Sequence, residues 1–365
     1  MFIGGEVYTR PSFGSNHPLS FTRQGAVVAM CDSLGWLEAD ACREAPQAAP
    51  DVLRRLHDAA YIGALRSASE LGRVSAEQRE RYRFGTMENP LFPGLFERAA
   101  STVGGSILAA QLALEGKVAF HPAGGTHHGK RDRASGFCYF NDPAFAVLTF
   151  LDAGLERVLY VDVDAHHGDG VFEAFAGDDR VACVSIHETD RWPNTGSAGE
   201  QDPRTLNVPV PWGVTDDEYD LVMAQLVLPF TTRFAPQALV VTCGADALHG
   251  DPLSKMKLSN GALWRAVLQL VEAVPASVVV GGGGYNPWTT VRCWAGLWGL
   301  LSGREFPSEL PQRARTLLEG FDSDLVDEDE MESFWHDSLA DPPMPGGTRP
   351  EVVELCKEIA GAHGL

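Results

Sequence analysis

The chain has 365 residues, 44% of them hydrophobic, and a formal net charge of −20 at pH 7, and this length allows one or two domains. The acidic excess argues against a general nucleic-acid surface, which needs clustered lysine and arginine, and it suits cationic partners instead. No apolar run reaches the length of a membrane span, no signal peptide opens the chain, and the seven scattered cysteines are typical of reduced thiols, so we expect a cytoplasmic protein.

Helical and strand patterns alternate along the chain. Apolar residues at helical spacing predict helices over 21–37, 49–72 and 95–114, whereas residues 79–93 are charged and then rich in proline and indicate a long loop. Short β-branched runs predict buried strands at 118–120, 158–163, 181–187, 206–210, 238–242 and 277–280, with helices at 143–153, 170–176, 216–234, 263–274 and 292–301. The alternation predicts an α/β fold with a mainly parallel central sheet flanked by helices.

No linker or internal repeat divides residues 20–320, so we expect one catalytic domain over residues 1–320. Residues 321–365 are acidic and contain several prolines. They predict a solvated, peripheral extension that ends in a helix at 350–362 packed on the same domain.

The stretch RVLYVDVDAHHGDG, residues 157–170, changes from a buried strand to reactive residues within four positions. If the backbone stays extended, Asp162, Asp164 and His166 project to the same side, because side chains along a strand alternate. Two carboxylates and an imidazole at the carboxyl end of a buried strand suit a divalent metal. A solvated polar turn is the commoner fate of such a motif, but here the preceding strand is too apolar to be exposed.

Polar residues also follow three other predicted strands: His127 and His128, Asp246, and Tyr285 after four glycines. In open α/β sheets, ligands bind outside the carboxyl ends of the strands. We therefore expect all four clusters to meet in one crevice.

The charge that each residue would bring to a divalent metal decides which residues we assign as ligands. Asp164, His166 and Asp246 offer two anionic oxygens and one nitrogen, and they leave a position open for water or substrate. Two carboxylates nearly neutralise a dication, so a separate general base is needed to activate the water. We treat His167 as structural.

The two adjacent histidines can supply that base. His127 and His128 each need an acceptor at the other ring nitrogen, and Asp162 and Asp169 are the available carboxylates. Tyr285 can donate a hydrogen bond to an oxyanion on the face opposite the metal.

The motifs YVDVDAHHGDG, GGTHHGKRDRASGFCYFND, GADALHGDP and GGGGYNPW together resemble the zinc-dependent histone deacetylase superfamily over roughly residues 16–320. The resemblance is to its bacterial, acetoin-utilisation-like branch near the class I enzymes, and Asp169 favours the class I side. It implies the arginase/deacetylase fold, zinc as the metal, and a metal-activated water that attacks an acetamide carbonyl. It also implies His127 and His128 as the base and acid pair and Tyr285 as the oxyanion donor.

The family pattern adds assignments that the residues alone do not give. His127 pairs with Asp162, and His128 with Asp169. A potassium ion is implied near a set of five residues: Asp162, Asp164, His166, Ser185 and Ile186.

The resemblance also assigns the substrate contacts. Phe137 and Trp192 match the aromatics that flank the acyl-lysine tunnel, although Trp192 alone would be read more readily as rim packing. Gly136 would line the tunnel with its carbonyl. Glu88 matches the rim acid that holds substrate backbone amides, but it is one methylene longer than the aspartate of the family.

The expected activity is hydrolysis of Nε-acetyl-lysine, or another short Nε-acyl-lysine, in a protein or peptide. An acetylpolyamine or other small-amide deacetylase would share every catalytic residue. A non-catalytic acyl-lysine binder is a third reading, but it would need a lost ligand or tyrosine, and all are retained. The hard ligands also suit Fe(II). The sequence indicates no oligomeric state.

Overall fold

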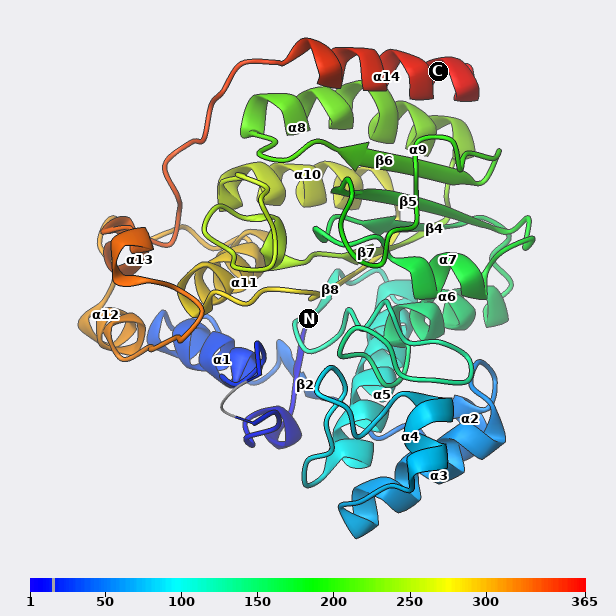
Figure 1. Cartoon of the computed structure of the whole chain (residues 1–365). Coiled ribbons are helices and arrows are strands. Elements are labelled where there is room, and N and C mark those ends of the chain that lie inside the picture. The colour runs from blue at the N-terminus through cyan, green and yellow to red at the C-terminus, as the bar shows by residue number, and fades with distance from the viewer. Residues whose placement is uncertain (15–16) are drawn as a thin grey trace.

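The computed structural model describes residues 1–14 and 17–365 and has a single eight-stranded sheet at its centre (Figure 1). The strand order is β2-β1-β3-β8-β7-β4-β5-β6, and every described pairing is parallel. The strands are β1 (Phe2–Gly4), β2 (Cys42–Glu44), β3 (Ala119–His121), β4 (Val158–Asp162), β5 (Val181–Glu188), β6 (Thr205–Val210), β7 (Ala238–Thr242) and β8 (Ala276–Val280). The predicted α/β fold with a parallel sheet is therefore confirmed.

Helices cover both faces of the sheet, which explains why the central strands are apolar along their whole length. On β4, Leu159 and Val161 join one buried cluster and Tyr160 joins the other. The second cluster includes residues of α5 (Leu95–Leu114), α6 (Asp142–Asp152) and α7 (Asp169–Ala174). The first includes residues of α1 (Arg23–Ser33), α8 (Asp216–Val222), η2 (Met223–Val227), α9 (Leu228–Phe234), α10 (Asn260–Ala273) and α11 (Pro287–Leu301).

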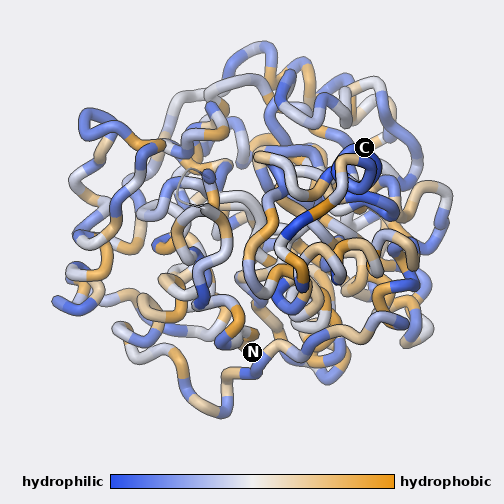
Figure 2. Tube along the Cα trace, turned by 60° about the horizontal axis from the view of Figure 1, so that its bottom comes forward, coloured by the Kyte–Doolittle hydropathy of each residue, from blue (hydrophilic) through white to orange (hydrophobic). Residues whose placement is uncertain are grey.

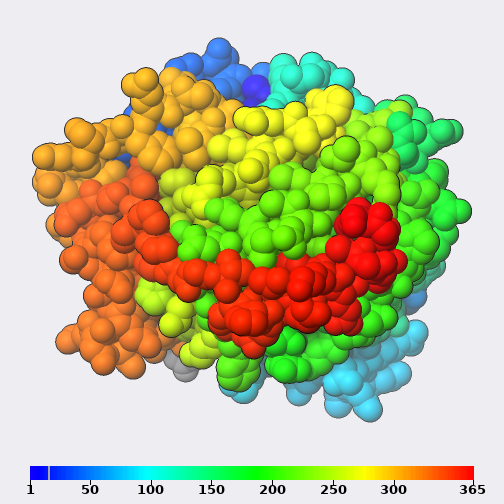
Figure 3. Space-filling view, turned by 90° about the horizontal axis from the view of Figure 1, so that it is seen from above, coloured from blue at the N-terminus to red at the C-terminus, as the bar shows by residue number. Residues whose placement is uncertain are grey.

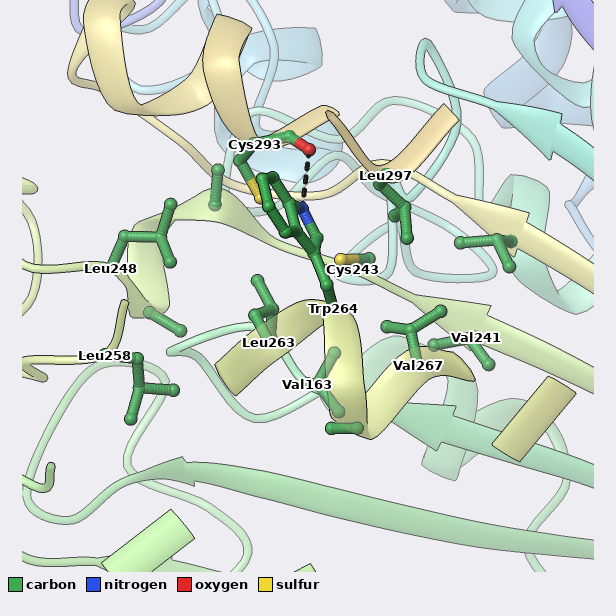
Figure 4. Close-up of a cluster of buried hydrophobic side chains, with 14 of the residues drawn as sticks. Val163, Val241, Cys243, Leu248, Leu258, Leu263, Trp264, Val267, Cys293 and Leu297 are labelled. Carbon is green, nitrogen blue, oxygen red and sulfur yellow. Dashed lines mark hydrogen bonds between the residues drawn. The ribbon is translucent and has the colours of Figure 1, made fainter. Parts of the chain in front are cut away.

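Buried hydrophobic side chains fill the interior on both faces of the sheet, and buried indole N–H groups find acceptors there. Figure 2 shows hydrophilic stretches concentrated at the outer bends of the chain. Trp264 of α10 is buried, and its indole N–H donates to the carbonyl of Cys293 on α11 at 2.8 Å (Figure 4). That bond removes the cost of burying the indole N–H and ties two helices of one face together. None of the described helices is long and apolar enough to cross a membrane.

Some element bounds differ from the prediction for identifiable reasons. The segment predicted as one helix over 49–72 forms α2 (Pro50–Leu53) and α3 (Ala59–Leu71). The predicted loop begins later, because residues 76–82 form α4 (Ala76–Tyr82) behind a capping box in which Ser75 and Gln78 satisfy each other's backbone N–H. Helix α11 begins at Pro287, five residues earlier than predicted, because the side chain of Asn286 caps it.

The C-terminal extension is less solvated than we expected. It contains η4 (Glu328–Glu330), α13 (Phe334–Asp337) and α14 (Pro350–His363), and α12 (Gln312–Glu319) directly precedes it. The short helices η1 (Glu6–Tyr8) and η3 (Ala245–Ala247) complete the described helices. Trp335, Cys356 and Ile359 are all buried, so the expectation of a solvated segment is wrong for these residues. In Figure 3 the last helix lies as a band across the surface, over elements from the middle of the chain.

The extension is anchored by a buried ion pair. Arg292 of α11 is 0% exposed and donates to the carboxylate of Asp341 at 2.7 Å and to the carbonyl of Ser338 at 2.5 Å. We expect Asp341→Ala to lower the free energy of unfolding by about 3–5 kcal/mol, because the guanidinium would be left buried without its counter-charge. Denaturant unfolding monitored by tryptophan fluorescence measures this loss.

The matched control is the exposed pair between Arg265 and Asp220. Asp220→Ala should cost only about 0–1 kcal/mol. If Asp341→Ala has an effect as small as that of the control, the extension does not unfold cooperatively with the rest of the domain.

Candidate active site

The candidate site lies at the carboxyl ends of four neighbouring strands, β3, β8, β7 and β4. Because all four are parallel, the loops that follow them leave from the same edge of the sheet. The loop after β3 carries His127 and His128, that after β4 carries Asp164 and His166, that after β7 carries Asp246, and that after β8 carries Tyr285. Residues up to 158 positions apart in the sequence thus reach one crevice.

Asp164, His166 and Asp246 form a group that could hold a metal ion. Each offers one ligand atom, and the three atoms lie within 4.8 Å of one another. The His166 Nδ1 atom is 2.9 Å from Asp246 Oδ2 and 3.2 Å from Asp164 Oδ1. Both carboxylates are fully buried. Two anionic oxygens and one imidazole nitrogen are a donor set that suits a catalytic divalent metal with an open position.

The electrostatics of this group call for a cation. Burial raises the pKa of Asp246 to about 6, and the neighbouring Asp164 adds to the rise. Burial opposes ionisation of Asp164 as well, but His127 and His166 hold its pKa well below the usual value. Burial disfavours the charged form of His166, yet its hydrogen bonds with the two carboxylates raise its pKa to about 10. In this arrangement the imidazolium supplies the positive charge that a bound dication would bring, so the residues fit a metal.

Glycines let the backbone approach these carboxylates. A Cβ at Gly283 would lie 1.9 Å from Asp246 Oδ2, and the Gly283 N–H donates to Asp164 Oδ2 at 2.6 Å. A Cβ at Gly244 would lie 2.1 Å from Asp164 Oδ2. No larger residue fits at either position without moving the ligands. This explains the glycine run that precedes Tyr285.

Each of the two adjacent histidines is paired with its own carboxylate. His127 Nδ1 lies 2.6 Å from Asp162 Oδ2, and His128 Nδ1 lies 2.7 Å from Asp169 Oδ1. These are the partners that the family pattern gives. The two rings are stacked obliquely, with centroids 3.9 Å apart. In each ring, Nε2 is left for the reaction crevice.

The two histidines nevertheless differ in charge state. Burial lowers the pKa of His127, but Asp162 and Asp164 outweigh it and raise that pKa to about 9. Burial lowers the pKa of His128 to about 3, and the charge on His127 contributes. Asp169 acts in the opposite direction without outweighing burial, and its other oxygen binds the ammonium of Lys130 at 2.6 Å. The directions of the two pKa shifts favour the cationic form of His127 and the neutral form of His128.

Tyr285 faces the crevice from the loop after β8. It is 7% exposed, and its backbone N–H donates to Asp251 Oδ2 at 2.7 Å. Burial raises the pKa of its phenol well above the usual value, and Asp246 and Asp164 contribute. The Tyr285 ring meets Phe137 edge to face at 5.9 Å. The phenol is thus fixed in place and keeps its proton.

The residues assigned to the tunnel lie together next to the histidines. Gly136 and Phe137 form a turn in the left-handed region, with φ of 53° and 67°. The Gly136 N–H donates to Glu88 Oε1 at 2.8 Å, which ties this turn to the exposed Glu88. Trp192 packs against His128 at 4.6 Å, and a Cβ at Gly136 would meet the Trp192 ring at 2.4 Å. The ring occupies space that only glycine leaves free.

The residues assigned to potassium include two of the metal group, Asp164 and His166, and three residues of the neighbouring strands β4 and β5. In the β4–β5 pairing Asp162 is opposite Ser185, and Ile186 follows it on β5. The Asp164 N–H donates to Asp162 Oδ1 at 3.2 Å. His167 is outside both groups, and its Nδ1 lies 2.8 Å from Thr195 Oγ1.

Sequence reasoning missed three residues that shape the site. Arg23 of α1 donates to the carbonyls of Gly282 and Gly284 at 2.8 and 3.2 Å. These two hydrogen bonds fix the glycine run that precedes Tyr285. No local signal reveals a contact over such a separation. Asp251 and Lys130, in contrast, stand inside the motifs GADALHGDP and THHGKRD, so the motifs themselves were the signal.

Comparisons with known proteins agree with this geometry. The model of the histone deacetylase domain matches residues 17–301. Histone deacetylase 8 of Xenopus laevis is 34% identical over 273 residues, which cover 72% of this chain and 83% of that protein. The acetoin utilization protein AcuC of Bacillus subtilis is 34% identical over 333 residues, which cover 85% of this chain and 84% of that protein.

Solved structures match the fold over nearly the whole chain. The crystal structure of a histone deacetylase homologue from Aquifex aeolicus superposes with a TM-score of 0.94 at 33% identity and covers 98% of both chains. A structure of such a homologue complexed with SAHA gives a TM-score of 0.93 at 32% identity and covers 98% of both chains. The chain therefore belongs to the histone deacetylase family, with the arginase/deacetylase fold and the hydrolytic deacetylase activity that its motifs indicated.

Proposed function

We propose that the chain is a zinc-dependent hydrolase that removes acetyl or another short acyl group from Nε-acyl-lysine in a polypeptide. The observation that carries this proposal is the group Asp164, His166 and Asp246, buried beside two histidine–carboxylate pairs and a fixed tyrosine. A scissile amide needs these three kinds of group together: an electrophile for its oxygen, a base for water and a donor for the oxyanion.

The metal ligands in this proposal are Asp164, His166 and Asp246. When bound, the ion polarises the amide carbonyl and lowers the pKa of the attacking water. Zinc is our assignment, and Fe(II) suits the same hard ligands. His166 would then bind as a neutral imidazole, because the ion takes over the charge that balances the carboxylates.

The histidines move the proton in this mechanism. The neutral His128 accepts it from the attacking water, and Asp169 stabilises the ring as the charge forms. His128 then returns the proton to the leaving lysine amine. His127, held cationic by Asp162, supports the negative charge that develops on the carbonyl oxygen. The opposite pKa shifts of the two rings support this division.

Tyr285 and the tunnel residues position the substrate. The Tyr285 phenol, which stays protonated, donates to the oxyanion from the side opposite the metal. Phe137 and Trp192 would enclose the aliphatic lysine stem, and the Gly136 carbonyl would accept its amide N–H. Glu88 would hold backbone amides at the rim, with the oxygen that Gly136 does not use.

The remaining assignments belong to the same proposal. A structural potassium ion would lie near Asp162, Asp164, His166, Ser185 and Ile186. Residues 1–320 would form the catalytic domain, with 321–365 as its extension. A cytoplasmic location is supported by the seven free thiols, six of which are buried.

The first test compares substrates side by side. The purified, zinc-loaded protein is assayed for kcat/KM on acetyl-lysine peptides, longer acyl-lysine peptides and acetylated polyamines. The net charge of −20 favours polyamines as the second candidate, because cations would collect near an acidic surface. Turnover of the peptides supports the proposal, preference for polyamines replaces it with the second candidate, and no turnover of any amide contradicts both.

We expect Tyr285→Phe to lower kcat by one to a few orders of magnitude, which is about 2–4 kcal/mol of transition-state stabilisation, with a modest change in KM. The hydroxyl acts on the oxyanion and not on the bound substrate, so its loss falls on kcat. Steady-state kinetics on one acetyl-lysine peptide measure it. An unchanged kcat would remove Tyr285 from the mechanism.

A pair of isosteric variants separates metal binding from proton transfer. Asp246→Asn should lose most of the bound metal, because it removes an anionic ligand. Asp169→Asn should keep the metal and lower kcat by about 10–100-fold, because it changes only the hydrogen-bond partner of His128, the proposed base. Metal content by elemental analysis and kcat are read on the same samples. Metal retained in Asp246→Asn, or lost in Asp169→Asn, would contradict the assignment.

A further inference from the structure

Three of the six large hydrophobic side chains exposed among the described residues are Met87, Trp192 and Trp212, with 92%, 40% and 59% of their surface exposed. We call these three residues the mouth surface, because Trp192 packs against His128 and Gly136, Met87 precedes the Glu88 that binds Gly136, and Trp212 binds Thr189 in the loop that carries Trp192. Single exposed apolar residues are ordinary on protein surfaces, but a group around one opening marks an interaction site.

Met87 and Trp192 lie on two sides of the same turn. Met87 directly precedes Glu88, whose carboxylate accepts the Gly136 N–H at 2.8 Å. The Trp192 ring lies against Gly136 from the other side, where a Cβ would approach it to 2.4 Å. Trp192 therefore contacts this turn directly, and Met87 adjoins it through its neighbour Glu88.

Trp212 adjoins the loop that carries Trp192. It lies two residues after β6, and its indole N–H donates to the carbonyl of Thr189 at 3.1 Å. Its carbonyl accepts from Arg349 at 3.0 Å, and the next residue, Gly213, donates to the carbonyl of Lys255 at 3.0 Å. Trp212 is thus held in place on three sides while most of its ring stays in solvent. Tryptophan is seldom left so exposed unless it contacts a partner.

Hydrogen bonds and an ion pair fix the loops that carry the mouth surface. Arg191, next to Trp192, donates to the carbonyl of Leu253 at 2.6 Å and pairs with the buried carboxylate of Glu188. Glu188 also accepts the Lys255 N–H at 3.0 Å. The loops after β5 and β7 are joined by these bonds into one platform. A partner that binds such a preformed platform loses little entropy in ordering it.

The charges around the platform suit a polypeptide better than a polycation. The exposed acidic residues named on this rim are Glu88 and Asp190, and the exposed lysines whose backbones bind the segment after Trp212 are Lys255 and Lys257. Lys257 is placed there by its N–H, which donates to the carbonyl of Val214 at 2.9 Å. The rim is therefore close to neutral, in contrast to the charge of −20 on the whole chain. A polyamine gains no focused attraction here.

We propose that the mouth surface is a docking site for the residues that flank the acyl-lysine of a polypeptide substrate. Trp212 selects an apolar side chain, aromatic above all, within about four residues of that lysine, a reach of about 13 Å for extended chain. The inference rests on the proposed function and deepens it, because it names a feature of the substrate sequence. Burial of an aromatic side chain on a fixed indole combines apolar area with ring packing.

The test is a position scan with the zinc-loaded full chain. An acetyl-lysine peptide with glycine at four positions on either side is the parent, and phenylalanine replaces one glycine at a time. A minimal substrate, acetyl-lysine blocked at both ends, is assayed beside it. We expect phenylalanine to raise kcat/KM by about tenfold at one or two positions, mostly through KM. In Trp212→Ala that gain should shrink to within about twofold, and Trp212→Phe should keep part of it.

The matched control is Leu325→Ala, which removes an exposed apolar side chain, 41% exposed, from the C-terminal extension. It should leave the gain from phenylalanine as in the unmodified protein, and thermal unfolding checks that all variants fold. Turnover of the minimal substrate without any gain from phenylalanine overturns the docking site alone. A gain that persists in Trp212→Ala overturns the role of Trp212. No turnover of any substrate overturns the proposed function and this inference with it.

Discussion

Two carboxylates, Asp164 and Asp246, are held side by side without contact to water, and the surrounding structure is arranged around that burial. An ionised carboxylate in an apolar interior is costly, and a second one beside it adds repulsion, so the pair is tolerable only next to a cation. Neighbouring parallel strands, β4 and β7, deliver the two residues to one edge. Glycines at 244 and 283 then let the backbone close around them, and the Gly283 N–H adds a hydrogen bond.

The buried carboxylates also determine the protonation of the two neighbouring histidines. His127 and His128 are adjacent, equally buried and each paired with an aspartate, yet their pKa values shift in opposite directions. The difference comes from the wider surroundings, because Asp164 and Asp246 add to the effect of Asp162 on His127, whereas the charges of His127 and His166 act on His128. His127 lies 3.8 Å from Asp164 as well, so it senses the buried pair directly. Two similar dyads thus give one imidazole with a raised pKa and one with a lowered pKa, an asymmetry suited to different roles for the two rings.

How much of this the sequence foretells depends on how local each signal is. The central strands were predicted nearly to the residue, because burial on both faces leaves an uninterrupted apolar run such as Ala238–Thr242. The polar residues of the crevice stand directly after such runs, so their meeting place followed from strand direction alone. Arg23 could not be found in this way, since its acceptors at Gly282 and Gly284 are distant in the chain. The buried anchors of the extension, such as Trp335, were hidden for a related reason: an acidic, proline-rich composition masks single apolar residues.

Selectivity between substrates depends on the rim of the crevice and not on its interior. Inside the crevice, every group acts on the amide itself, and an acylated lysine and an acylated polyamine present the same amide to Asp164, His128 and Tyr285. Discrimination between them must therefore come from groups that meet the rest of the substrate, since only those contacts differ between the two. In this structure such groups are the carboxylates of Glu88 and Asp190, the exposed lysines at 255 and 257, and exposed aromatic surface. Apolar area stabilises a bound apolar side chain more than a chain interrupted by hydrated ammonium groups, and the balanced charges of the rim give a polycation no focused attraction. The physical chemistry of the rim therefore favours a polypeptide.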